Sequence, residues 1–260
     1  MINRALNKFN QLLFKFNPKI NKNIITKKIG TFYGGYDICD DQLKIPNIIS
    51  CGLGEDATFD IEMINNYNAK IFAIDPTPRA KNHYLEICKN FGKANEKEYN
   101  ESGNLDVRCY DLKKVNKYNF LFLEKAIWGK KNEKLKLFYP QDQNSVSCSI
   151  DSNINSENNY FYSETITYES IIENYGLKRV DILKLDIEGA EIDVLKDVIK
   201  SNNLPKQILV EFDIRRKPSL KNKKILKQIH NLLLSKYDLI KINTKGDFTY
   251  LLINLDEKKI

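Results

Sequence analysis

The sequence predicts an α/β fold built on a doubly wound, mostly parallel sheet. From Asn47 onward, short apolar strands alternate with amphipathic helices, a pattern typical of parallel strands joined by crossover helices. In segment 181–191 an apolar strand is followed by two carboxylates, a glycine and then a helix. In such folds ligands bind at the carboxyl ends of the strands, where these carboxylates lie. Segments 238–243 and 248–253 flank Lys245-Gly246-Asp247 and predict a closing antiparallel pair.

The hydrophobic period of each segment gives the remaining elements in order. The predicted strands are 47–51, 70–74, 119–127, 134–139, 181–185 and 207–212. The predicted helices are one from about Asp56, then 79–91, one after 165–168 that ends by Gly176, 190–200 and 220–235. We expect 119–127 and 134–139 to form a hairpin across 129–133, and the Asn- and Ser-rich segment 141–159 to be a binding loop.

Length and apolar spacing predict one domain, residues 29–260, preceded by a basic amphipathic helix in residues 1–28. Leu6, Phe9 and Leu13 recur at helical spacing among lysines, and the helix should end near Pro18. The apolar stripe favours docking on the domain or on a second copy of the chain in a homo-oligomer. Peripheral contact with an anionic membrane surface is the alternative.

Composition and charge exclude several classes of protein. The chain is 42% hydrophobic and 29% charged, and no apolar run is long enough to span a bilayer. The first residues lack a secretory signal and the five cysteines include no C-x-x-C pair, so we expect a cytoplasmic protein with reduced thiols. A net charge of +7 would suit nucleic acid, but basic residues gather at the two ends, which favours a solubilising surface and disfavours a nucleic-acid partner.

A glycine-rich turn follows the first of these strands. Gly52, Gly54 and Ala57 fit G-x-G-x-x-A at the start of a helix, and Asp75 lies about 20 residues further on, at the end of the next strand. The pattern suits either a dinucleotide, whose pyrophosphate binds the helix N-terminus, or S-adenosylmethionine, with the acid on the ribose hydroxyls. Glu55 and Asp56 would repel a pyrophosphate, so the turn favours S-adenosylmethionine.

A family resemblance rests on four segments and on Glu211 downstream of them. The segments are 50–60, 75–79, 125–129 and 183–191. They resemble the FkbM-family methyltransferases, and the most specific part is the string Leu-Lys-Leu-Asp-Ile-Glu-Gly-Ala-Glu at 183–191. The resemblance implies a class I, Rossmann-like methyltransferase sheet with S-adenosylmethionine as methyl donor. It also implies O-methylation of a hydroxyl, often on a sugar of a glycan, glycoconjugate or natural product.

The resemblance also implies roles for individual residues. It places Gly52 and Gly54 at the methionine part of the cofactor, Asp75 at the ribose, and Ala126 with Ile127 at the adenine edge. The other cofactor-binding residues that we predict are Ser50, Asp56, Pro76 and Asp186. The Tyr-Gly-Gly-Tyr segment at 33–36 resembles an element that closes over the carboxylate end of the cofactor.

Asp186 and Glu188 are the predicted catalytic residues. Methyl transfer to a hydroxyl needs alignment and a base that takes the proton, and a carboxylate at a strand end can supply both. These acids could instead hold Mg²⁺ together with Glu211 or Asp213, but we do not favour a metal and predict no metal ligand. Glu191, inside the following helix, is interpreted as structural.

Two other functions stay open. The positive charge could draw a methyltransferase to nucleic acid or protein, although the strand-end sequence Leu-Asp-Ile-Glu at 185–188 lacks the turn that grips a flipped base. A non-catalytic binding module on the same fold is the second, and the intact glycine turn, Asp75 and the strand-end acids argue against it. The identity of the acceptor is not encoded in any motif, because specificity loops carry no sequence code.

Overall fold

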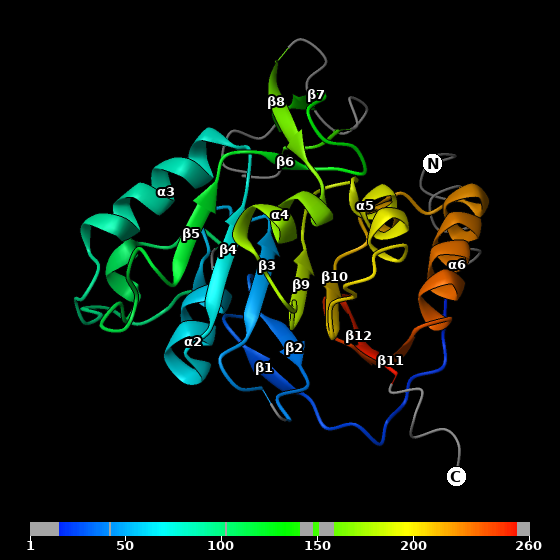
Figure 1. Cartoon of the computed structure of the whole chain (residues 1–260), viewed down its shortest axis with the longest axis horizontal. Coiled ribbons are helices and arrows are strands. Elements are labelled where there is room, and N and C mark those ends of the chain that lie inside the picture. The colour runs from blue at the N-terminus through cyan, green and yellow to red at the C-terminus, as the bar shows by residue number, and fades with distance from the viewer. Residues whose placement is uncertain (1–15, 42, 102, 141–147, 151–158, 254–260) are drawn as a thin grey trace, which may run out of the picture.

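The computed structural model describes residues 16–41, 43–101, 103–140, 148–150 and 159–253. Within them the main sheet has seven strands in the order β11-β12-β10-β9-β3-β4-β5 (Figure 1). These strands are β3 (Asn47–Cys51), β4 (Lys70–Ile74), β5 (Phe120–Leu123), β9 (Ile182–Leu185), β10 (Gln207–Val210), β11 (Tyr237–Ile242) and β12 (Phe248–Leu252).

The strand order reverses at the centre of this sheet. The chain runs from β3 outward through β4 to β5, then returns to the other side of β3 as β9 and continues to β10, all in parallel. β12 pairs with both β10 and β11 in antiparallel fashion and closes the sheet. The mostly parallel sheet and its closing antiparallel pair are thus confirmed. The reversal between β3 and β9 is where a doubly wound fold opens its ligand crevice.

Helices and a small hairpin cover the sheet through two hydrophobic layers. One layer joins the sheet to α4 (Tyr168–Tyr175), α5 (Glu191–Val198) and α6 (Leu220–Leu234). The other joins it to α2 (Thr58–Tyr67), α3 (Pro78–Lys89) and the hairpin of β1 (Lys27–Ile29) with β2 (Tyr36–Ile38). Because both faces are covered, every residue of β9 and β10 is buried, which explains why these strands are apolar except for Lys184 and Gln207.

Local signals in the sequence fix the ends of the helices. The Thr77 side chain accepts a hydrogen bond from the Ala80 amide and Pro78 occupies the first turn, so α3 begins there. α4 ends at Gly176, as predicted, and this glycine adopts the left-handed conformation. Ser219 caps α6 through the Asn222 amide.

A second, three-stranded sheet lies over the carboxyl ends of the main strands (Figure 1) and corrects two predictions. It consists of β6 (Ala126–Ile127), β7 (Lys134–Phe138) and β8 (Tyr160–Ile166). The predicted strand 119–127 is two strands in different sheets, because the charged pair Glu124-Lys125 breaks it and binds outward to Lys81 and Glu164. The predicted hairpin with 134–139 is wrong, since β7 pairs in antiparallel fashion with β8.

The predicted N-terminal helix falls largely on residues 1–15, which lie outside the described residues. The described part of 1–28 is not helical, and Lys27 and Lys28 already belong to β1. The Phe16 ring packs edge-on against His230, with ring centroids 5.2 Å apart, so the segment docks on α6. No helix in the described part of the chain is long and apolar enough to cross a membrane.

Candidate functional site

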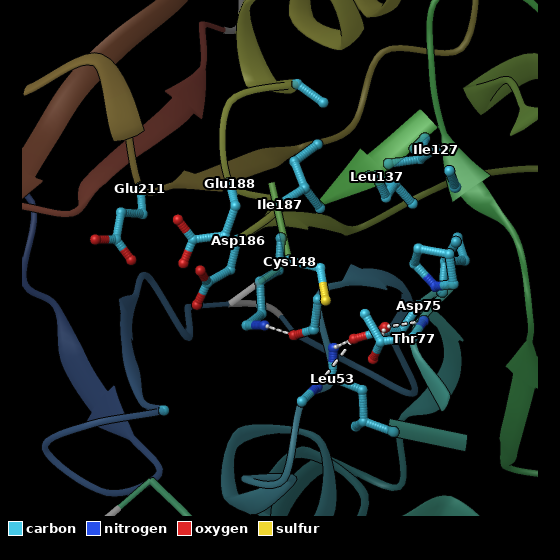
Figure 2. A pocket seen from close by; sticks show the side chains of 18 of the residues that line it. Leu53, Asp75, Thr77, Ile127, Leu137, Cys148, Asp186, Ile187, Glu188 and Glu211 are labelled. Carbon is cyan, nitrogen blue, oxygen red and sulfur yellow. Dashed lines mark hydrogen bonds between the residues drawn. The ribbon is translucent and has the colours of Figure 1, made fainter. Parts of the chain in front are cut away.

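A cavity opens at the carboxyl ends of the central strands, beneath the second sheet (Figure 2). One part, here called the turn side, is lined by Gly52, Leu53, Gly54, Asp75, Pro76, Thr77, Ala126, Ile127, Leu135 and Leu137. The other part, the acid side, is lined by Tyr33, Asp186, Glu188, Glu211, Arg216 and Lys245. The cavity therefore occupies the reversal point of the sheet, and it gathers residues from both ends of the chain.

Gly52 brings the first turn against the end of β9. Its φ is +85°, and a Cβ added there would lie 1.8 Å from the carbonyl oxygen of Asp186. The Gly52 amide donates to the Ile74 carbonyl at 3.0 Å, and the Asp186 amide donates to the Cys51 carbonyl at 3.0 Å. Only glycine fits where two strand ends close in this way. The turn and Asp186 are thus one unit in space.

Asp75 accepts four hydrogen bonds, two from the glycine turn and two from Thr77. Its Oδ2 accepts from the amides of Leu53 and Gly54 at 2.9 and 3.0 Å, and its Oδ1 accepts from the Thr77 amide and hydroxyl at 2.8 and 2.6 Å. Burial raises the pKa of Asp75, and these hydrogen bonds oppose that rise. A carboxylate offers about four acceptor positions, so protein donors already use them. Asp75 lines the cavity, and a ribose hydroxyl would have to share its oxygens.

The two other acids of the turn are also engaged by the protein. The Glu55 carboxylate accepts two hydrogen bonds from Arg79, at 3.0 and 2.6 Å. The Asp56 carboxylate accepts from the hydroxyls of Thr31 and Thr58 at 2.7 and 2.6 Å. Asp56 also lines the cavity. A Cβ added to Gly34 would lie 2.6 Å from the carboxyl carbon of Asp56. Asp56 therefore fixes the 33–36 segment over the turn.

The remaining residues predicted to bind a cofactor divide into two groups. Pro76, Ala126 and Ile127 line the turn side of the cavity. Ser50 does not line the cavity: it is fully buried in β3 beneath the turn, beside Asp60 of α2. The reason is that Ser50 lies within β3, on the same face as Ile48 and the α2 layer, whereas the cavity begins at Gly52, where the strand has ended.

Asp186 directly follows β9 and reaches the acid side. Its Oδ2 accepts a hydrogen bond from the Tyr36 hydroxyl at 3.1 Å. Burial and the neighbouring Asp186 carboxylate raise the pKa of Tyr36 well above its ordinary value, so the phenol stays protonated and donates. The predicted catalytic acid is therefore oriented by the 33–36 segment.

Glu188 stands in an unusual backbone conformation beside a shared arginine. Its φ is +50°, a left-handed value that costs a non-glycine residue on the order of 1 kcal/mol. Its carbonyl oxygen accepts from the Ser149 hydroxyl at 2.9 Å, and its carboxylate binds Arg216 Nη1 at 2.6 Å. Arg216 Nη2 binds Glu211 at 2.7 Å, so one guanidinium joins the ends of β9 and β10.

Glu211 is a pocket acid that the sequence did not rank as catalytic. Burial and the neighbouring Asp186 carboxylate raise the pKa of Glu211 to about 7, while Arg216 acts in the opposite direction. An acid with such a pKa changes charge near neutral pH. Its position directly after a central strand could have signalled it.

Lys184 is a second residue that sequence reasoning missed. It is 4% exposed on β9, and its Nζ donates to the Gly52 carbonyl at 2.7 Å. The same ammonium lies 5.4 Å from the centre of the Tyr36 ring and counters the buried acid Asp60. A lysine within an apolar strand is rare unless paired, and this was the available signal.

Three other titratable residues are structural. Glu191 is buried in the first turn of α5, where it accepts a hydrogen bond from the Gly189 amide at 2.7 Å, and burial raises its pKa to about 8. His83 contacts the Tyr110 hydroxyl at 2.9 Å and His230 that of Tyr250 at 2.8 Å. Within the described residues, no group of three or more histidines, cysteines or acids could hold a metal ion.

The sheet order, the closing antiparallel pair and a glycine turn held by a carboxylate are the features of a Rossmann-like methyltransferase sheet. More specifically, residues 41–236 match the model of the Methyltransferase FkbM domain, and the chain belongs to that family. A solved structure of a fibrillarin/Nop5p complex is similar at 10% identity and a TM-score of 0.40, over 80% of this chain and 72% of that chain. No curated protein matches this chain.

Proposed function

We propose that the protein is an S-adenosylmethionine-dependent O-methyltransferase acting on a sugar hydroxyl of a glycan, glycoconjugate or natural product. The observation that carries the choice of cofactor is the bonding of Asp75. A dinucleotide site uses the amides of its glycine turn to bind a pyrophosphate, but here the Leu53 and Gly54 amides donate to a carboxylate. The turn therefore suits a ligand that carries cationic groups and no phosphate.

The turn side also fits the other parts of that ligand. Gly52 and Gly54 line this side with bare backbone, directly beside Asp186. Ala126, Ile127 and Leu137 are apolar and buried, so they suit the flat face of an adenine. When bound, S-adenosylmethionine supplies a methyl group made electrophilic by its sulfonium. The chain's own task is to exclude water, align the hydroxyl and remove its proton.

The acid side supplies those functions. Asp186, held by Tyr36, accepts a hydrogen bond from the acceptor hydroxyl and orients its oxygen. Glu188, fixed by Arg216, adds a second negative charge beside it, and the two are the catalytic pair that we propose. A sugar hydroxyl is neutral and donates hydrogen bonds, which matches a surface rich in carboxylate acceptors. We propose no metal in this step, since Arg216 already provides a cation between the acids.

Calorimetry with the full chain tests the choice of cofactor. We expect S-adenosylmethionine to bind and NAD⁺ to give no heat under the same conditions. Methylation assays with labelled S-adenosylmethionine and panels of glycans, nucleic acids and proteins then test the acceptor class. Heat with NAD⁺ alone, or label in nucleic acid or protein but not in glycans, would contradict the proposal.

The variant Asp186→Asn tests the catalytic assignment. The amide keeps an oxygen that can accept from Tyr36, so the fold and the affinity for S-adenosylmethionine should persist. Turnover should fall by about 10²-fold or more, because the carboxylate that aligns the acceptor hydroxyl is lost. Retained turnover with lost cofactor affinity would make Asp186 a binding residue. The matched control is Asp193→Asn, an exposed acid on α5 outside the cavity.

A further inference from the structure

We propose that Glu211, oriented by Arg216, receives the proton of the attacking hydroxyl, and that Arg216 is a positioning residue for the acid side. This inference rests on the proposed function and names the residue that takes the proton. It assigns Asp186 and Glu188 to alignment of the acceptor and Glu211 to proton transfer.

The geometry of Arg216 supports this division. Its guanidinium binds Glu188 at 2.6 Å, Glu211 at 2.7 Å and Asp213 at 3.4 Å, so one positive charge serves three carboxylates. The Arg216 guanidinium fixes the Glu211 side chain at the end of β10, and this side chain stays 26% exposed along the cavity. A proton acceptor needs this combination of fixed position and access to the substrate.

The other two cavity acids are less suited to take a proton. Asp186 already accepts a hydrogen bond from the Tyr36 hydroxyl at 3.1 Å, so one of its oxygens is engaged by the protein. Glu188 shares Arg216 with Glu211, but it is 13% exposed against 26% for Glu211, and its backbone is also held by Ser149. Around Glu211, by contrast, the neighbouring carboxylates outnumber the single positive charge of Arg216. The charged and titratable groups that act on it or are affected by it are Asp186, Glu188, Asp247, Arg215, Arg216, Tyr33 and Tyr36.

The step balances in atoms and charge. A bond forms between the hydroxyl oxygen and the methyl carbon, and the carbon–sulfur bond breaks with its electron pair remaining on sulfur. The hydroxyl proton passes to the Glu211 carboxylate. The sulfonium becomes a neutral thioether and the carboxylate becomes a neutral acid, so one positive and one negative charge disappear together within the cavity.

Carbon-13 NMR of the full chain, labelled at the glutamate carboxyl carbon, tests the proposal without an acceptor. Glu211→Gln assigns the signal, whose titration midpoint we expect at about 7. Arg216→Gln should raise the midpoint, because a positive charge is lost, and Asp186→Asn should lower it, because a negative charge is lost. Arg216→Lys should restore most of the wild-type value. The control Arg108→Gln removes an exposed, remote arginine and should change nothing.

Cofactor titrations then place Glu211 relative to the reacting atoms. If it lies beside the transferring methyl group, S-adenosylmethionine should lower its midpoint by roughly one pH unit relative to S-adenosylhomocysteine, which lacks the sulfonium charge. Equal midpoints with the two bound ligands, or shifts of the same sign in Arg216→Gln and Asp186→Asn, would overturn the proposal. Absence of binding by either ligand in calorimetry would instead reject the proposed function.

Discussion

Replacement of Gly52 by alanine tests whether the turn and the end of β9 form one unit. The new Cβ would lie 1.8 Å from the Asp186 carbonyl oxygen, whereas an ordinary carbon–oxygen contact is about 3.3 Å. One strand end must therefore move by more than about 1 Å, and the neighbour is backbone that cannot rotate away. The φ of +85° adds the strain of a left-handed residue, about 1–2 kcal/mol.

Gly92→Ala is the matched control. Its φ is +81°, but a Cβ there meets nothing within 4 Å, so this variant carries the strain without the collision. We expect it to lose about 1–2 kcal/mol of unfolding free energy and to bind S-adenosylmethionine normally. Gly52→Ala should lose about 1–3 kcal/mol more from overpacking, and its affinity should fall on the order of 100-fold because the turn is displaced.

Thermal unfolding and calorimetry on both variants measure the two effects. Each kcal/mol should lower the melting temperature of a chain of this size by about 2–4 °C, so the two variants are distinguishable. Equal melting temperatures for Gly52→Ala and Gly92→Ala, with wild-type affinity in both, would refute the reasoning about this contact.

Three further predictions concern the surroundings of the site. Burial raises the pKa of Glu191 to about 8 from its ordinary 4.5, so its contribution to stability is complete below pH 4.5 and is lost as the pH rises through 8. Urea unfolding should show a decline of at most several kcal/mol over this range that Glu191→Gln removes, and an equal decline in the variant would contradict it. Lys184→Met should lose about 3 kcal/mol or more, because it leaves Asp60 without a counter-charge, and adding Asp60→Asn should recover part of the loss. Additive unfolding free energies in that cycle would show that the two residues are not coupled. EDTA should change neither the melting temperature nor the affinity for S-adenosylmethionine, because Arg216 already lies between Glu188 and Glu211, and a fall in either value would indicate a metal.

The parallel strands could be predicted because their physical causes are local. β9 and β10 are buried along their whole length, so their residues are mostly apolar, and each strand is followed by an acid at the cavity. The turn at Gly52 and the acid at Asp75 also follow from spacing, since both stand directly after a strand. The reversal of strand order then brings them to one edge.

The second sheet could not be predicted because its pairing is not local. β7 pairs with β8, which begins at Tyr160, across a long polar segment, while a rule of neighbouring strands favours a hairpin with β6. The site residues that the sequence did not reveal were missed for the same reason, because their contacts are not local in the sequence. Lys184 reaches Gly52 and Tyr36 reaches Asp186 from positions that are 132 and 150 residues away along the chain. Spacing within a motif carries no information on such contacts.

The structure also indicates why substitutions at Asp186 can report on charge alone. The backbone of Asp186 is fixed twice, by its amide on the Cys51 carbonyl and by its own carbonyl against Gly52. Its side chain is oriented by a third contact, from the buried Tyr36 hydroxyl. Because two of these contacts are independent of the side chain and an asparagine oxygen can accept the third, Asp186→Asn should retain the position and lose the charge. Loss of turnover in that variant would therefore measure the carboxylate's electrostatic contribution rather than a displaced strand end.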